Sequence, residues 1–284
     1  PHTPITLSSE VAPVLREYER CSTTAVNAAV APLMGRYLAR LQARVAPAHL
    51  HIENSAGGLL PVAAALVEPV HTVLSGPAGG VRGAWLAGLR VGARRLLTVD
   101  MGGTSTDVAL LEGALQPQDA GSVAGHPLRI PLLPIETVGA GGGSIAWIDS
   151  GGLLRVGPRS AGAMPGPAAY GQAGEQAEAT VTDAHVVLGR LRDLLGGEMA
   201  LDRSAAEAAV ARLGQRLGSD PAQTAAAIIA VATATMARAC KRVSMARGVD
   251  PRGTSLVAFG GAGGLHACEL AEELGCPEVI FPSE

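Results

Sequence analysis

The spacing of apolar positions divides this chain into stretches with different periods. From Glu17 to Val45 apolar residues recur at helical spacing while arginines occupy another face, which predicts a long helix. Between Leu96 and Gly157 short apolar runs alternate with turn residues, which is typical of antiparallel strands. Because the helical period returns from Val181 onward, we expect a mixed α/β protein with strands first and helices afterwards.

Shorter patterns in the first third of the chain each predict one element. A glycine loop, Ser75–Gly80, precedes one predicted helix, so its free N–H groups suit an anion and its small residues equally suit close helix packing. The expected strands are Ile5–Val14, Leu50–Glu53 and His71–Leu74, and the expected helices are Leu60–Leu66 and Val81–Leu89.

The remaining elements follow from the same two periods, with proline and glycine marking their boundaries. Gly162–Gly174 is rich in glycine, proline and alanine and is expected to be a loop. Strands are expected at Leu96–Asp100, Asp107–Leu111, Leu128–Thr137, Ser144–Asp149, Leu153–Gly157, Ser255–Phe259 and Glu278–Phe281, and helices at Val181–Leu195, Ser204–Leu217, Pro221 to about Arg247, and Leu265–Leu274.

One turn among these strands has more polar chemistry than a turn requires. Residues 99–111, VDMGGTSTDVALL, run from one apolar strand into the next through two glycines and three consecutive hydroxyl residues. Gly102 and Gly103 let the backbone aim several N–H groups at one point, which suits phosphate oxygens. Asp100 and Asp107 bracket the turn and suit hydrated Mg²⁺ or a positioned water. An ordinary glycine-containing hairpin with solvated polar residues is the alternative.

A second glycine turn lies between a predicted strand and a predicted helix. Residues 258–264, AFGGAGG, would let a flat nucleoside lie against bare backbone, because Gly263 and Gly264 place no side chains there. The spacing does not match the G-x-G-x-x-G dinucleotide fingerprint, and the chain contains no Walker sequence. The two turns together predict one nucleotide site, with the earlier turn at the phosphates and the later turn at the base.

Composition and charge narrow the possible function classes. Hydrophobic residues make up 48% of the 284 residues and aromatic residues 2%, so an aliphatic core is expected to fill one large domain or two lobes. A net charge of -3 without a basic run argues against nucleic-acid binding. The apolar stretches Leu59–Val70 and Ala225–Ala237 are too short or too close to charged residues to predict a membrane span. The 4 cysteines form no CxxC pair, which predicts reduced thiols in a cytoplasmic protein and no structural zinc site.

Both glycine turns resemble known nucleotide-binding sequences. Residues 99–111 resemble the second phosphate segment of the actin, sugar kinase and Hsp70 type of ATPase, and residues 258–264 resemble its adenosine segment. Further sequences narrow the resemblance to the hydantoinase A and 5-oxoprolinase family, which is similar in turn to subunits of ATP-dependent acetone and acetophenone carboxylases. These sequences are REYERCSTTAVNA (16–28), SGPAGGV (75–81), ETVGAGGGSIAWID (136–149), GPRSAGAMPGPAAYG (157–171), TVTDAHVVLGRL (180–191) and AFGGAGGLHA (258–267).

The resemblance implies an α/β fold of the ribonuclease H-like, actin-like ATPase type, with a mixed sheet flanked by helices and two lobes that hold ATP between paired hairpins. It implies that residues 1–92 are the tail of the first lobe and residues 93–284 are the second lobe. The family's earlier DxGGT-type phosphate loop is missing here, and Ala169 stands where many members have cysteine. Because the chain also begins at Pro1 without Met, we expect a fragment with weak or undetectable catalysis on its own.

The activity implied by the resemblance is the ATP-dependent opening of a cyclic amide or imide ring, of the hydantoin or 5-oxoproline type. Phosphorylation of the carbonyl oxygen would make the ring carbon attackable by water. Two other functions stay open, namely a subunit of an ATP-dependent ketone carboxylase and a non-catalytic actin-like module that binds nucleotide. The expected cofactors are ATP and Mg²⁺, and a hydantoinase B-like subunit or domain is an expected partner.

Individual residues are assigned roles within this implied activity. Asp100 is expected to contact Mg²⁺ through water and to serve catalysis, and Asp107 to support the hairpin or the metal shell. Glu136 and Asp183 are candidates for acid–base or metal-shell work, with a solvated strand residue and a helix N-cap as their respective alternatives. The expected phosphate-binding residues are Gly102, Gly103, Thr104, Ser105 and Thr106, and the expected adenosine-binding residues are Gly260, Gly261, Gly263 and Gly264.

Two histidines lie beside these candidates. His185 is not expected to share a metal with Asp183, because a spacing of two residues places them on different faces of a helix. His266 follows the second glycine turn and is expected either to contact nucleotide or, more simply, to bond to local backbone.

Overall fold

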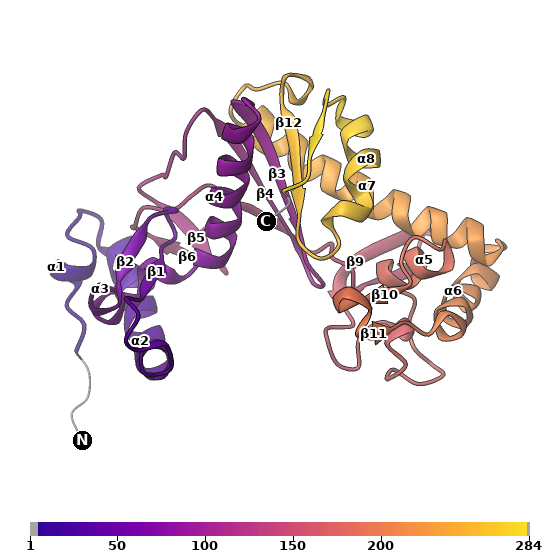
Figure 1. Ribbon diagram of the computed structural model, residues 1–284, viewed down its shortest axis with the longest axis horizontal. Coiled ribbons are helices and arrows are strands. Elements are labelled where there is room, and N and C mark those ends of the chain that lie inside the picture. Colours follow the sequence, from indigo (N-terminus) through magenta and orange to yellow (C-terminus); the bar gives the residue numbers. More distant parts are fainter. Residues whose placement is uncertain (1–4, 283–284) are drawn as a thin grey trace. The chain divides into compact units, whose positions relative to one another are not determined.

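The computed structural model describes residues 5–282 and divides into two compact units (Figure 1). Of the described residues, unit 1 comprises 5–89 and 111–135, and unit 2 comprises 90–110 and 136–282. The chain therefore forms most of unit 1 first and enters unit 2 at residue 90. It returns to unit 1 for residues 111–135 and then completes unit 2.

Unit 1 is mostly helical, with two small antiparallel strand pairs. The apolar residues Leu128, Ile130 and Leu132 of the returning segment form a buried cluster with Val11 and Val70 from the first part of the unit. The elements of unit 1 are α1 (Ser8–Val11), α2 (Glu17–Val45), β1 (His51–Glu53), β2 (Leu59–Pro61), α3 (Val62–Val67), η1 (Pro69–Thr72), α4 (Ser75–Arg90), β5 (Gly121–Val123) and β6 (His126–Leu128).

Two buried polar side chains fasten the long helix α2 within unit 1. The Asn27 Oδ1 atom accepts a hydrogen bond from Val70 N–H at 3.1 Å, and its Nδ2 donates to the Val67 carbonyl at 3.4 Å. The Thr23 hydroxyl accepts from Arg129 N–H at 2.9 Å. Both residues belong to the REYERCSTTAVNA sequence, and their side-chain hydrogen bonds hold α2 to other segments of unit 1.

Unit 2 is built on a five-stranded mixed sheet with the strand order β13-β12-β3-β4-β7. β12 pairs in parallel with both β3 and β13, whereas β4 pairs antiparallel with β7. β3, β4 and β12 lie side by side in Figure 1. The five strands span β3 (Arg95–Met101), β4 (Thr106–Glu112), β7 (Glu136–Val138), β12 (Ser255–Phe259) and β13 (Val279–Ile280).

Helices and a separate hairpin complete unit 2. Its core combines apolar residues of the sheet with those of α5, α6, α7 and α8, and contains many alanines and few aromatic residues, as the composition predicts. The elements are β8 (Ser144–Ile148), β9 (Leu154–Ser160), η2 (Ala168–Tyr170), α5 (Val181–Val187), β10 (Asp193–Leu194), η3 (Leu195–Gly197), β11 (Met199–Ala200), α6 (Arg203–Leu217), α7 (Pro221–Met245), η4 (Pro251–Gly253) and α8 (Gly263–Leu274).

The helix α7 is long and apolar. By length and composition alone it could cross a membrane, but 56% of its most apolar 18-residue window is buried inside the protein. It packs against α5, α6 and α8. Its apolar surface is therefore largely used within unit 2.

Some predicted elements of unit 1 are wrong. The strands expected at Ile5–Val14 and His71–Leu74 are replaced by the helix α1 and by the 3-10 turn η1. The first stretch mixes apolar and polar residues without a clear period, and the second is a short apolar run. Neither pattern distinguishes a strand from a helical turn. The glycine loop expected at Ser75–Gly80 is instead the beginning of α4, and a Cβ at Gly79 would lie 3.1 Å from Glu53 Oε2. This contact favours the close-packing interpretation of those small residues.

The elements around both glycine turns are confirmed, and two other predicted elements are wrong. Leu128–Thr137 is not one strand, since it holds only the end of β6 and the start of β7. The helix expected over Val181–Leu195 ends at Val187, and Gly189 with a φ of 71° turns the chain away. The apolar residues beyond this glycine continue the helical period only by chance.

Candidate functional site

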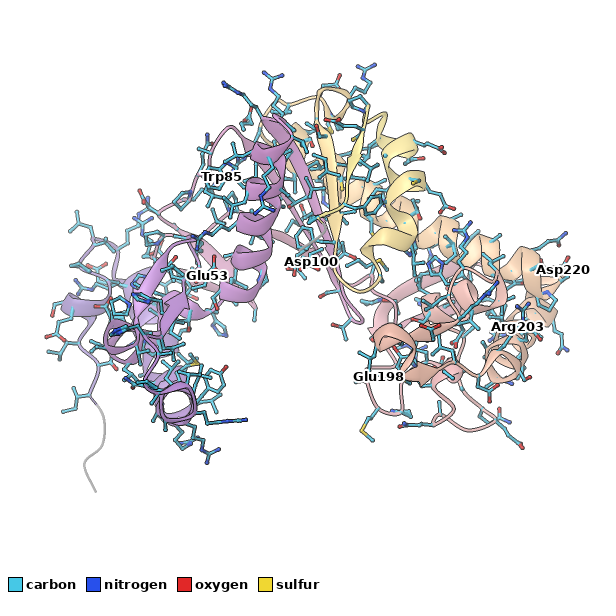
Figure 2. The ribbon with its side chains drawn as sticks, viewed as in Figure 1. Glu53, Trp85, Asp100, Glu198, Arg203 and Asp220 are labelled. Atoms are coloured by element: carbon cyan, nitrogen blue, oxygen red, sulfur yellow. The ribbon has the colours of Figure 1, made fainter. Side chains whose placement is uncertain are left out.

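The first glycine turn joins β3 to β4 in the middle of the sheet of unit 2. It closes through a hydrogen bond from Gly102 N–H to the Ser105 carbonyl at 3.0 Å. Gly103 and Thr104 are exposed, and Ser105 is half-buried. Figure 2 shows Asp100 near the end of these strands. The turn thus presents bare backbone and two hydroxyl residues next to a carboxylate.

A third glycine segment, residues 139–143, packs directly against this turn. Gly142 N–H donates to the Gly102 carbonyl at 3.0 Å, and Gly143 N–H donates to the Gly103 carbonyl at 2.6 Å. A Cβ at Gly141 would lie 2.6 Å from the backbone nitrogen of Ser105, so a larger residue would push the turn away. The dense glycines of GAGGG are the sequence signal for such a close contact, and the sequence predictions assigned them no role.

Thr106 lies differently from its two hydroxyl neighbours. Its side chain is fully buried, and its Oγ1 donates to the Ala140 carbonyl. We therefore correct the expectation that the Thr106 hydroxyl reaches a phosphate, because that hydroxyl fastens β4 to the 139–143 segment. Thr104 and Ser105 remain as hydroxyl donors at the turn.

The second glycine turn meets the first. The Ala262 N–H donates to the Met101 carbonyl at 2.9 Å, which ties residues 260–263 to the end of β3. Gly260 has a φ of 81°, and a Cβ there would contact Asp100 Oδ1 and lie 2.6 Å from the Met101 carbonyl oxygen. Segments about 160 positions apart in the chain therefore converge because β12 pairs in parallel with β3.

The four glycines of the second turn fall into two kinds. Gly260 and Gly263 lie against the backbone of β3, and a Cβ at Gly263 would lie 3.5 Å from the Val99 carbonyl oxygen. Gly261 has no atom within 4 Å of its Cβ position, and Gly264 meets only the Phe281 ring at 3.7 Å. Gly261 and Gly264 are also exposed, so they are the positions at which a flat ligand could lie against backbone.

Asp100 is the ionisable group at the junction of the two turns. Burial raises the pKa of the Asp100 carboxyl, and the negative charge of Asp107 raises it further. Asp107 lies on β4 and accepts a hydrogen bond at its Oδ1 from the Thr137 hydroxyl at 2.5 Å. Within residues 5–282 no cluster of three or more His, Cys, Asp or Glu side chains is arranged to hold a metal ion. A cation beside these two aspartates would take its other ligands from water or phosphate.

Glu136 forms an ion pair with Arg242. The Arg242 Nε donates to Glu136 Oε1 at 2.8 Å, and its Nη2 contacts the same oxygen, which joins β7 to α7. Neither side chain is fully buried. The structure therefore supplies a structural role for Glu136, and its acid–base role stays a prediction.

Asp183 is fully buried and holds two segments together. The N-cap of α5 is Thr180, and Asp183 stands three residues later, where its Oδ2 accepts from Thr180 N–H at 2.9 Å and from the Thr180 hydroxyl at 2.8 Å. Its Oδ1 accepts from Ala169 N–H at 2.7 Å. Burial raises the pKa of Asp183, and these hydrogen bonds oppose that shift. We therefore correct the N-cap alternative to the third helical residue of a capping box.

The two histidines form a buried pair. The Nε2 atoms of His185 and His266 are 3.0 Å apart, with ring planes at 83°. His266 Nδ1 lies 3.0 Å from the Thr233 hydroxyl of α7. Burial lowers the pKa of His185 to about 3 and that of His266 to about 4. His266 is thus buried, and its two ring nitrogens face His185 and Thr233 and not the local backbone, which corrects the expectation of a backbone bond.

Comparison with known proteins finds similar sequences over nearly the whole chain. The Hydantoinase/oxoprolinase family model matches residues 20–284. The chain is 42% identical to caprolactamase subunit alpha of Pseudomonas jessenii, over 96% of this chain and 40% of that protein. It is 36% identical to the 5-oxoprolinase PfmaA of Pestalotiopsis fici, over 98% of this chain and 22% of that protein.

The fold is also similar to solved structures. The nucleotide-free structure of acetone carboxylase matches with a TM-score of 0.84 and 29% identity, over 96% of this chain and 39% of that chain. The chain therefore spans less than half the length of the relatives it matches.

Proposed function

Because this chain belongs to the hydantoinase/oxoprolinase family, we propose that it forms part of an ATP-dependent enzyme that opens a cyclic amide or imide ring. Named relatives are a caprolactamase and a 5-oxoprolinase, and both names denote amide-hydrolysing enzymes. The ring of a hydantoin, a 5-oxoproline or a caprolactam is the substrate class that these relatives support.

The meeting of the two glycine turns at Asp100 is the observation that carries this proposal. The first glycine turn offers bare backbone and the hydroxyls of Thr104 and Ser105, which suit the oxygens of a phosphate. The exposed Gly261 and Gly264 offer a surface without side chains, which suits a flat base. A single nucleotide could engage both, since hydrogen bonds join the two turns at the end of β3.

ATP makes chemical sense for this substrate class. The carbon of an amide is a poor electrophile, and its nitrogen is a poor leaving group. Transfer of the γ-phosphoryl group to the carbonyl oxygen releases ADP and makes the carbon attackable. Water then adds to that carbon, and the ring C–N bond breaks with the proton of the added hydroxyl going to nitrogen, which leaves an acyl phosphate. A second water hydrolyses the acyl phosphate to the carboxylate and releases phosphate. The part of this chain is to hold and orient the phosphates.

Asp100 and Asp107 would hold hydrated Mg²⁺ in this proposal. Mg²⁺ keeps several waters and uses one or two carboxylates together with substrate phosphates. A raised pKa at Asp100, caused by burial and by Asp107, marks a place where a positive charge would relieve the unfavourable negative charge. The ion would neutralise part of the phosphate charge during transfer.

We further propose that unit 2 is one lobe of a ribonuclease H-like, actin-like ATPase. The support is its sheet, in which β3 lies in the middle, β4 and β7 follow on one side, and β12 and β13 follow on the other. Chain segments containing helices connect β7 to β12 and β12 to β13. A second lobe and a partner subunit would complete the enzyme, and the name caprolactamase subunit alpha supports the partner.

A carboxylase subunit is the second candidate function. The fold match to acetone carboxylase favours it, because that protein uses ATP to carboxylate a ketone. The same phosphate site would then activate an enolate or bicarbonate in place of a lactam. Product analysis with labelled bicarbonate distinguishes the two reactions, since only carboxylation incorporates the label.

ATP turnover in the full natural protein tests the proposed function. We expect lactams or imides to stimulate ATP hydrolysis, and Asp100→Asn to abolish the stimulation. The exposed Asp193→Asn in the same unit is the control and should behave as wild type. Turnover by residues 1–284 alone should be weak or undetectable. An ATPase that responds to no lactam, imide or ketone would favour a non-catalytic nucleotide-binding module.

A further inference from the structure

The short helix α5 has an unusual use of polar residues. All seven of its residues are buried, although three of them, Thr182, Asp183 and His185, carry polar side chains. Buried polar groups cost free energy unless they are hydrogen-bonded, so a short core helix normally avoids them. Each of these three side chains bonds to a different segment outside α5.

Thr182 connects α5 to the first glycine turn. Both its backbone N–H and its hydroxyl donate to the Gly142 carbonyl, at 2.7 Å and 2.9 Å. The same residue, Gly142, donates its own N–H to the Gly102 carbonyl at 3.0 Å. A Cβ at Gly142 would lie 2.9 Å from Thr182 Oγ1, so the contact is close as well as hydrogen-bonded. A single residue, Gly142, therefore links α5 to the first glycine turn.

His185 connects α5 to the second glycine turn. Its partner His266 lies in the first turn of α8, which begins at Gly263 within that turn. The Nδ1 of His185 is buried without a hydrogen-bond partner, so this ring makes its one polar contact across to α8. If His185 Nε2 donates to His266 Nε2, the Nδ1–H of His266 donates to Thr233, and only a lone pair on His185 stays unpaired.

We propose that α5 is a brace that sets the spacing between the two glycine turns, with Thr182 and His185 as positioning residues for the nucleotide. The proposal rests on the proposed nucleotide site. Neither side chain touches the ligand, because both are buried behind the turns. Thr182 acts through Gly142 on the phosphate side, and His185 acts through His266 on the base side.

Thr182→Val tests the first arm of the brace. The change keeps the shape and the backbone N–H bond but removes the hydroxyl bond to Gly142. We expect the Kd for ADP with Mg²⁺ and the KM for ATP to rise about three- to tenfold, with kcat changed less. Thr182→Ser, which restores the hydroxyl, should recover most of the affinity.

Thr235→Val is the matched control for this arm. The Thr235 hydroxyl also donates to a backbone carbonyl, that of Val231, but within its own helix α7. We expect its Kd for ADP to equal that of wild type. Equal Kd values for wild type and Thr182→Val, with wild type binding ADP, would overturn the brace and leave the nucleotide site intact. A wild-type protein that binds no nucleotide would overturn both.

Two substitutions of His266 test the second arm. In His266→Gln the amide reaches the position of Nε2 and keeps the contact with His185, whereas in His266→Asn it reaches only the position of Nδ1 beside Thr233. We expect His266→Asn to weaken ADP binding about three- to tenfold more than His266→Gln. Thermal unfolding without nucleotide checks that both variants are folded at the assay temperature. Equal losses of affinity in the two folded variants would contradict the His185 arm.

Discussion

Gly260 is the residue on which the meeting of the two glycine turns depends. Its φ of 81° lies in the left-handed region, and a Cβ there would contact Asp100 and lie 2.6 Å from the Met101 carbonyl oxygen. We expect Gly260→Ala to lower the free energy of unfolding by about 2 kcal/mol. It should also weaken ADP binding, because the turn must move away from β3. Urea unfolding followed by circular dichroism measures the first effect.

The neighbouring Gly261→Ala is the control for that substitution. No atom lies within 4 Å of its Cβ position, and Gly261 is not among the positive-φ residues. We expect its free energy of unfolding to stay within about 0.5 kcal/mol of wild type. Similar losses of stability in the two variants would show that the close approach of Gly260 to β3 is not what holds the turn.

The two aspartates of the site give a second prediction for single residues. Burial is the larger cause of the raised pKa at Asp100, and the charge of Asp107 is the smaller one. Asp107→Asn should therefore lower the Asp100 pKa but leave it above its ordinary value. Carbon-13 NMR titration of the aspartate carboxyl groups measures this. An unchanged Asp100 pKa would show that the two side chains do not interact.

At the scale of elements, the contact between α5 and α8 predicts sensitivity to acid. The pKa of His185 is lowered to about 3 and that of His266 to about 4, mainly by burial. The unfolded chain therefore takes up protons near pH 6.5 while the folded chain does not, so stability falls as the pH falls from about 6.5 toward 4. Each histidine contributes a slope of up to about 1.4 kcal/mol per pH unit.

Urea unfolding at pH 7, 6, 5 and 4 measures that slope. The double variant His185→Gln with His266→Gln should show a flatter dependence than wild type, whatever its stability at pH 7. The exposed His126→Gln is the control and should keep the wild-type slope. A double variant with the wild-type slope would place the acid sensitivity elsewhere.

Elements whose apolar pattern is regular over many residues, or which flank a distinctive turn, were predictable from the sequence. Elements of only a few residues without such a signal were not. The helix over Glu17–Val45 and the strands around both glycine turns follow from local patterns, and the structure has them at nearly the expected bounds. At His71–Leu74 a few apolar residues fit either a strand or a helical turn, and tertiary packing decides between them. The length of α5 was overestimated because a glycine, Gly189, interrupts an otherwise helical spacing.

The parts of the candidate site that were predictable are those formed by residues close together in the sequence. Both glycine turns and Asp100 are visible in short sequences, and a parallel pairing of β12 with β3 brings them together. The bonds of Thr182 to Gly142 and of Arg242 to Glu136 join residues far apart in the chain, and no local pattern announces them. The buried positions of Thr106 and His266 likewise depend on neighbours from other elements.

At the scale of the whole molecule, the return of residues 111–135 to unit 1 decides where the chain can be divided. A fragment of residues 93–284 would carry Leu128, Ile130 and Leu132 without Val11 and Val70, against which they pack. We expect this fragment to aggregate through its exposed apolar surface. The same fragment with residues 113–134 replaced by a short glycine-serine linker should remain monomeric. Size-exclusion chromatography compares the two, and identical behaviour would contradict the assignment of this segment to unit 1.

The order of strands in the sheet has a consequence for synthesis on the ribosome. β3 lies between β4 and β12, but β12 is translated about 150 residues later. At roughly 5–20 residues per second, one edge of β3 waits roughly 8–30 seconds for its partner. During that time the apolar Leu97 and Val99 are available to other nascent chains. Slow decoding before Ser255 would lengthen this exposure, and chaperone demand should rise with it.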